Sequence, residues 1–162
     1  MDWKTLFLTA DGRIGQKDFW IGFLILFVAG LVLGMIPLLG MIIGLALIYP
    51  NVCLYSKRLH DAGRSGWLAA VPYAIGCVGF LLMMMMGGMG AMGAMMGGGN
   101  DAMASAGMMA GLGAMGLIGL LMFAALIGFL LWVGLAKGDP GDNRYGPPPR
   151  SLISSTTPTP VA

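Results

Sequence analysis

The chain has 162 residues, of which 57% are hydrophobic and only 10% are charged, and its mean hydropathy is +0.83. Soluble domains carry about 25% charged residues, so this composition excludes an ordinary soluble domain and indicates a membrane protein. A net charge of +2 without any basic run gives no indication of nucleic-acid binding, so we expect no nucleic-acid partner.

Four apolar runs are long enough for a helix to cross the hydrocarbon layer, which takes about 20 residues. A charged segment, residues 1–18, precedes the first run. Because this segment is long and no small-residue cleavage site follows Met35, an uncleaved anchor fits the first run better than a signal peptide. The predicted spans are residues 19–36, 38–55, 67–86 and 115–136, which together form a transmembrane domain over residues 19–136.

The basic residues predict how these spans are oriented. All nine lie in three segments: before the first span, between the second and third spans, and after the fourth. Cytoplasmic loops of membrane proteins carry an excess of lysine and arginine, and four spans place all three segments on one face. We therefore expect an all-α membrane protein, a small bundle of four transmembrane helices with both termini in the cytoplasm.

The segment between the second and third spans, residues 57–67, reads "KRLHDAGRSGW" and holds the chain's only histidine. Lys57 and Arg58 precede Asp61 by four and three residues, so either cation can meet the carboxylate on the last turn of a helix. Cations also suit the negative end of the helix dipole. Most of this polarity therefore has a structural explanation.

Three further residues of this bend have structural roles as well. Gly63 is suited to end the second predicted helix, because glycine adopts the left-handed conformation without strain. Ser65 is a good N-cap for the third helix, and Trp67 is placed to anchor that helix at the headgroup level. All four tryptophans lie close to the basic segments, which indicates an aromatic belt at the inner face.

His60 is the remaining residue of the bend. A lone histidine beside one aspartate, Asp61, is a poor metal site, because structural and catalytic sites need three or four ligands. We expect a packed, hydrogen-bonded imidazole. A pH-sensitive contact and a catalytic role are the alternatives, since histidine titrates near neutral pH.

Residues 83–116 hold twelve of the sixteen methionines, mixed with glycine and alanine. Because glycine disfavours helix, we expect no regular helix between Gly87 and Gly99 and an outer loop over residues 87–114. Thioether sulfurs favour Cu(I), but a site needs several converging sulfurs, often with a histidine that this stretch lacks. We therefore predict a low-complexity connection at the outer leaflet, with no metal site and no cofactor.

Three blocks of the sequence resemble the motifs of one family. Residues 57–67 resemble its "RRLHD-x-GRSGW" signature, and residues 138–149, "GDPGDNRYGPPP", resemble "GTPGxNRYGPDP". Residues 11–20, "DGRIGQKDFW", resemble "GR-x-x-R-x-E-F-W", with Gln16 and Asp18 at the second arginine and the glutamate. The chain is thus similar to the YhaH-like family of bacterial inner-membrane proteins, catalogued as domain of unknown function 805. The resemblance implies a multi-pass inner-membrane protein and no assigned activity.

Each of these blocks lies at the expected cytoplasmic end of a predicted span and carries charges of both signs. We therefore expect them to meet in a short cytoplasmic cap that includes residues 137–150, followed by a disordered tail over residues 151–162. Asp61 is the expected hub, with Arg13 or Arg144 as its planar two-pronged donor. The candidate interaction residues are Arg13, Arg58, His60, Asp61, Arg64, Ser65, Trp67, Asn143, Arg144 and Tyr145.

The leading functional interpretation is a non-enzymatic protein whose cap binds anionic lipid headgroups or a protein partner, a second copy of the chain included. A transporter or channel subunit for a small solute or a metal ion is the first alternative. It draws on Pro50 and Asn51, which interrupt the second span, and on the methionine-rich segment as a Cu(I) ligand. A membrane enzyme that uses His60 and Asp61 is the second alternative.

Overall fold

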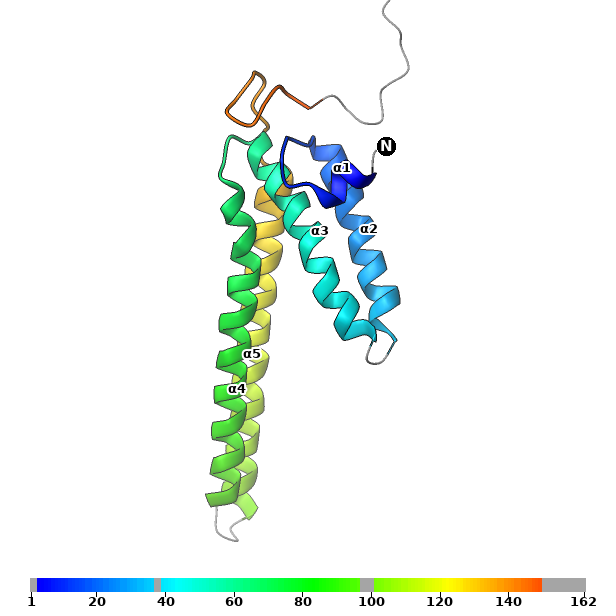
Figure 1. Ribbon diagram of the computed structural model, residues 1–162. Coiled ribbons are helices and arrows are strands. Elements are labelled where there is room, and N and C mark those ends of the chain that lie inside the picture. The colour runs from blue at the N-terminus through cyan, green and yellow to red at the C-terminus, as the bar shows by residue number, and fades with distance from the viewer. Residues whose placement is uncertain (1–2, 37–38, 97–100, 150–162) are drawn as a thin grey trace, which may run out of the picture. The chain divides into compact units, whose positions relative to one another are not determined.

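The computed structural model describes residues 3–36, 39–96 and 101–149, and these residues form helices and no strand. Four helical segments are long and apolar enough to cross a membrane, which confirms the predicted all-α membrane fold with four spans. The elements are α1 (Trp3–Leu8), α2 (Gln16–Gly34), α3 (Leu39–Asp61), the 3-10 helix η1 (Gly66–Ala70), α4 (Val71–Met96) and α5 (Asp101–Leu135) (Figure 1). The predicted disordered tail, residues 151–162, lies outside the described residues.

Two helices are longer than the hydropathy pattern predicts. The helix α2 begins at Gln16 instead of residue 19, and Asp18 in its first turn suits the positive end of the helix dipole. The helix α3 runs to Asp61 instead of residue 55, with Arg58 and His60 in its last turn. The ends of both helices thus contain charged residues. A hydropathy pattern assigns such residues to loops and so predicts helices that are too short at these ends.

The predicted outer loop over residues 87–114 is wrong. The helix α4 continues to Met96, and α5 already begins at Asp101, so only residues 97–100 of that segment lie outside the described helices. Each interior glycine disfavours an isolated helix by about 1 kcal/mol relative to alanine. Here the glycines let two backbones meet, because a Cβ on Gly90 would lie only 3.0 Å from the Cα of Gly111.

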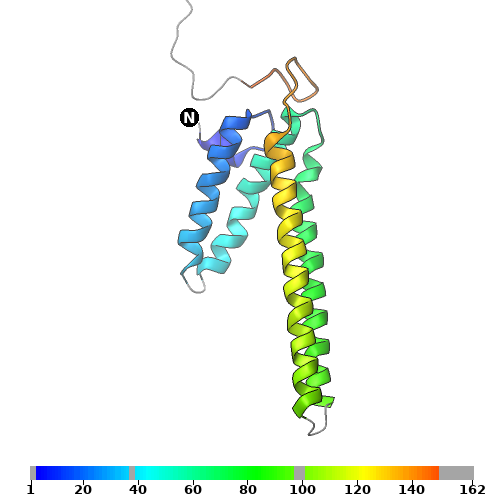
Figure 2. The same ribbon diagram turned by 180° about the vertical axis from the view of Figure 1, so that it is seen from behind.

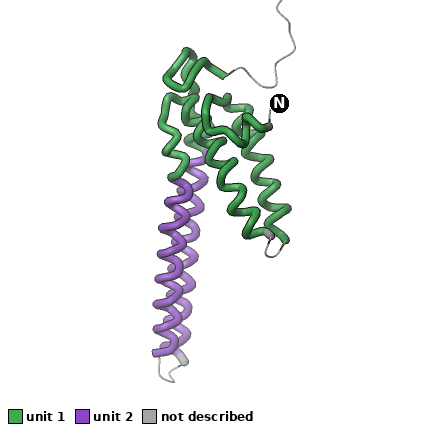
Figure 3. Tube along the Cα trace, viewed as in Figure 1, with its two compact units in different colours: residues 1–70, 131–162 green, residues 71–130 purple. Residues whose placement is uncertain are grey.

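The chain divides into two compact units (Figure 3). Unit 1 comprises residues 1–70 and 131–162, and unit 2 comprises residues 71–130. Within unit 2, α4 and α5 form an antiparallel helical hairpin, and both views show the two helices side by side (Figures 1 and 2). Unit 1 holds α1, α2, α3, η1 and the last residues of α5.

The core of unit 1 lies at the charged end of α2 and α3. Phe19 is fully buried and packs edge-to-face on Tyr55, with their ring centroids 5.4 Å apart. Leu54 is buried beside Gly22, where an added Cβ would approach its Cδ1 to 2.7 Å. Farther along both helices the large apolar side chains are exposed, Leu31 by 57% for example, as expected of surfaces that face lipid. This core therefore fixes the helix ends that carry the three sequence blocks.

Candidate functional site

Arg13, between α1 and α2, lies at the centre of a buried polar cluster in unit 1. Its side chain is 1% exposed, and its Nε and Nη2 donate to Oδ1 of Asp61 over 3.1 and 3.0 Å. Its Nη1 donates to the backbone carbonyls of Gly141 and Gly146 over 2.8 and 3.1 Å. We define the polar cluster as Arg13, Arg58, His60, Asp61, Asp139, Asn143 and Tyr145. Arg13 thus joins the segment before α2, the end of α3 and the segment after α5.

Asp61 accepts from two arginines at once. Arg58 Nη1 donates to its second carboxylate oxygen, Oδ2, over 2.6 Å, and both side chains are at most 5% exposed. Arg58 also donates through Nη2 to the carbonyl of Ala136 at the end of α5. Buried charges are stable only where hydrogen bonds replace the lost hydration. Arg13 meets that condition through Asp61 and carbonyl oxygens. Arg58 meets it through Nη1 and Nη2, while its Nε is buried without a hydrogen-bond partner.

Two pairings differ from those expected of Asp61. Lys57 is buried and donates to the backbone carbonyls of Thr5 and Leu6 in α1, so it ties α1 to α3 instead of pairing with the aspartate. Arg144 is exposed and lies over the ring of Tyr145, 4.7 Å from its centroid. Of the two candidates, Arg13 and Arg144, it is therefore Arg13 that donates to Asp61 with two N–H groups.

The segment after α5 folds onto the end of α3 because its small and amide residues fit there. A Cβ on Gly138 would overlap the carboxylate of Asp61, and the backbone N–H of Asp139 donates to the Asp61 carbonyl over 2.7 Å. Asn143 Nδ2 donates to the carbonyl of His60 over 3.0 Å. The same amide group donates to Asp139 Oδ2 over 2.9 Å. Asp139 belongs to the third block, whose charges are expected in the cap, whereas the close approach of Gly138 to Asp61 has no signal in the sequence.

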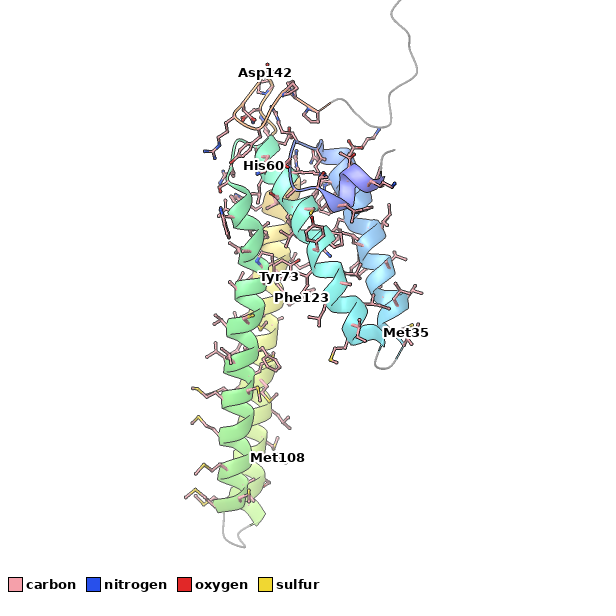
Figure 4. The ribbon with its side chains drawn as sticks, viewed as in Figure 1. Met35, His60, Tyr73, Met108, Phe123 and Asp142 are labelled. Atoms are coloured by element: carbon pink, nitrogen blue, oxygen red, sulfur yellow. The ribbon has the colours of Figure 1, made fainter. Side chains whose placement is uncertain are left out.

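His60 is packed and hydrogen-bonded on both ring nitrogens. Its Nδ1 lies 3.2 Å from the carbonyl oxygen of Gly12, and its Nε2 lies 3.4 Å from Ser56 Oγ. A carbonyl oxygen only accepts, so we assign the proton to Nδ1, and Nε2 of the neutral ring accepts from the serine hydroxyl. The ring stacks on Tyr145 with centroids 3.7 Å apart, beneath the loop that carries Asp142 (Figure 4). The predicted packed, hydrogen-bonded imidazole is therefore confirmed.

A protein-family model, described as "Protein of unknown function (DUF805)", matches residues 7–97. The chain belongs to the DUF805 family. The match confirms the resemblance that the sequence blocks indicate, and its range contains both Arg13 and the bend of residues 57–67. No curated protein and no solved structure matches the chain.

In this DUF805 protein the third block, residues 138–149, lies outside the matched range but packs on residues inside it. The buried contacts of Arg13 and Asp61 therefore connect the family region with a segment beyond it. Among the described residues, no group of three or more His, Cys, Asp or Glu side chains is arranged to hold a metal ion.

The rim of the polar cluster carries exposed cations on aromatic rings. Arg64 lies over Trp132 with its guanidinium carbon 4.4 Å from the ring centroid, as Arg144 does over Tyr145. Trp67 is 87% exposed. Ser65 begins the next turn with its backbone carbonyl, which accepts from the N–H of Leu68 over 3.2 Å. The predicted interaction residues thus divide into two groups: those of the polar cluster, centred on Arg13 and Asp61, and those exposed at its rim.

Proposed function

We propose that this membrane protein is non-enzymatic and binds anionic lipid headgroups at the cytoplasmic face of the bacterial inner membrane. The observation that carries the proposal is that two arginines of this region are buried and two are exposed. Arg13 and Arg58 are buried and use their donors on Asp61 and on carbonyl groups. Arg64 and Arg144 are exposed, so their guanidinium groups are accessible to a phosphate outside the protein, although Arg144 Nη2 also donates to the Gly63 carbonyl over 3.5 Å.

The aromatic neighbours support this assignment. A guanidinium that rests on a ring is held in place and is weakly hydrated, so less freedom is lost when it binds a phosphate. Trp67 and Trp132 are residues of the kind that sit at the headgroup level, which would put Arg64 at the depth of the lipid phosphates. Each basic residue near an anionic surface contributes about 1 kcal/mol. The cytoplasmic orientation rests on the positive-inside rule.

The transport alternative receives no support from the second span. The helix α3 continues through Pro50, and Asn51 Nδ2 donates over 2.8 Å to the carbonyl of Leu47 in the same helix. The side-chain amide of Asn51 thus hydrogen-bonds within its own helix. The enzymatic alternative relies on His60 together with Asp61. The Asp61 carboxylate accepts from Arg13 and Arg58, and the ring nitrogens of His60 lie beside Gly12 and Ser56 instead.

Native mass spectrometry of the protein from nanodiscs that contain phosphatidylglycerol tests the proposal. We expect the parent protein to retain this anionic lipid in preference to a zwitterionic lipid, and Arg64→Gln with Arg144→Gln to weaken retention about tenfold or more. The matched control, Lys4→Gln with Lys17→Gln, removes the same charge from exposed lysines. Equal losses in both variants, or a bound protein in place of lipid, would contradict the proposal.

A further inference from the structure

His60 lies where three segments of unit 1 meet. Its Nδ1 lies 3.2 Å from the carbonyl oxygen of Gly12, which precedes α2. Its ring stacks on Tyr145 of the third block, and its own carbonyl accepts from Asn143 of the same block (Figure 4). The third block is therefore docked on the one kind of side chain whose ordinary titration falls near neutral pH.

The 3-10 helix η1 closes the other edge of the imidazole. A Cβ on Gly66 would overlap Ser56 Oγ and would lie 2.8 Å from His60 Nε2, so the backbone of η1 packs directly against the serine and the ring. Ser56 is buried, and His60 is half-buried. Protein atoms thus adjoin both ring nitrogens while the third block is docked.

A second proton on the ring conflicts with this arrangement. In the neutral ring Nε2 accepts from the Ser56 hydroxyl, whereas the imidazolium has two N–H donors and no acceptor. The hydroxyl must then turn its hydrogen away from the ring. The new charge also forms where the Tyr145 ring and backbone atoms replace part of the water, and lost hydration disfavours the charged form.

The third block itself brings a positive charge to the same place. Arg144 lies over the ring of Tyr145, 4.7 Å from its centroid, and His60 stacks on that ring at 3.7 Å. An imidazolium would therefore be the second cation at one tyrosine ring. Like charges at short range disfavour protonation, and this repulsion ends when the third block leaves.

The other neighbouring charges offset this repulsion only in part. Asp11 directly precedes Gly12 and would favour an imidazolium, but it is exposed, so water and salt screen its charge. The carboxylate of Asp61 already accepts from Arg13 and Arg58. The helix η1, with the sequence GWLAA, contributes no charged side chain.

We propose that the docking of the third block is pH-sensitive: the block stays on the end of α3 while His60 is neutral and is released when the ring takes up a proton. This regulation is separate from the lipid binding proposed above. A group that binds its proton more weakly in the docked form favours release as the pH falls. Docking is therefore strongest above about pH 6.5, where free histidine titrates, and weakens below it.

Distances between two spin labels on the full-length protein in nanodiscs test the proposal. The labels are attached at Gln16→Cys and Asp142→Cys, two exposed positions before and within the docked region. The background variant Cys77→Ala leaves only the buried Cys53. At about pH 7.5 one narrow distance distribution is expected. At about pH 5 the population with a longer, broader distribution rises about threefold or more.

The control variant His60→Asn keeps an N–H donor for the Gly12 carbonyl and has no proton to gain. Its distance distribution does not change between the two pH values. Because Asp61 and Asp139 remain in this variant, an acid response that persists in it would assign the release to carboxylates and overturn the proposal. Distances in the parent that do not change with pH would overturn it as well.

Nuclear magnetic resonance of the imidazole gives a second test that does not depend on replacing His60. It is the chain's only histidine, so its titration is observed without overlap. Docking and proton uptake are linked, so displacing the third block by Gly138→Ala moves the titration midpoint to higher pH. Gly141→Ala, where a Cβ meets nothing within 4 Å, leaves the midpoint unchanged. A midpoint that stays the same although the spin labels show the block displaced would contradict the proposal.

Discussion

At the scale of single residues, the polar cluster depends on which groups can lie close to the Asp61 carboxylate. Arg13 meets it with two N–H donors and uses its other donors on carbonyls that follow α5. Lysine at this position would offer one compact ammonium group and could not span these acceptors. The backbone of Gly138 lies so close to the same carboxylate that a side chain at this position would overlap it. The cluster is therefore sensitive to geometry as well as to charge.

A single methyl group at Gly138 is expected to displace the segment after α5. In Gly138→Ala the new Cβ overlaps Asp61 Oδ2, so the free energy of unfolding in nanodiscs should fall by about 1–3 kcal/mol. Gly141→Ala is the matched control, because a Cβ there meets nothing within 4 Å. Limited proteolysis of residues 138–149 measures the displacement directly. Equal cleavage of the two variants would contradict the assigned contact.

At the scale of elements, hydropathy predicts which segments are spans, and packing decides how far each helix extends. The prediction of a loop over residues 87–114 is wrong because it relied on helix propensity, which is a property of the local sequence. The contact between Gly90 and Gly111 joins two helices and cannot be derived from that local property. The proximity of Arg13 and Asp61 could be predicted, because topology places both blocks at one face. The partners of Lys57 could not, because they are backbone carbonyls whose positions depend on the fold of α1.

The glycine contact makes a prediction for the hairpin. Gly90→Leu inserts a side chain against the backbone of Gly111 and should lower the stability of unit 2 by about 2 kcal/mol or more. Gly88→Leu makes the same chemical change where a Cβ meets nothing within 4 Å, and should leave stability nearly unchanged. Thermal unfolding followed by circular dichroism distinguishes the two. A hairpin that tolerates both substitutions equally would show that the helices do not meet at Gly90.

At the scale of the whole molecule, the four spans and the three basic segments predict on which side of the membrane the termini lie. A four-span topology predicts that all nine basic residues face one side, and the positive-inside rule predicts that this side is the cytoplasm. Unit 1 holds the three sequence blocks at the charged ends of its helices, and unit 2 holds the methionine-rich segment of residues 83–116.

Reporter fusions test that orientation. Alkaline phosphatase fused after Arg150 should be inactive and a fluorescent protein fused there should be bright, because the segment after α5 is expected in the cytoplasm. A fusion within residues 97–100 should give the opposite pair of signals. Active phosphatase after Arg150 would contradict the four-span topology.

The central claim is that buried Arg13 holds the three sequence blocks together, through its ion pair with Asp61 and its bonds to carbonyls of the third block. A double-mutant cycle on the ion pair tests it most directly. Arg13→Gln, Asp61→Asn and the double variant are compared by their free energy of unfolding in lipid nanodiscs. The contact at 3.0 Å predicts a coupling energy of about 1 kcal/mol or more. The exposed Arg144, replaced in the same way, serves as the control and should be additive with Asp61→Asn. Strict additivity of Arg13→Gln and Asp61→Asn would contradict the account.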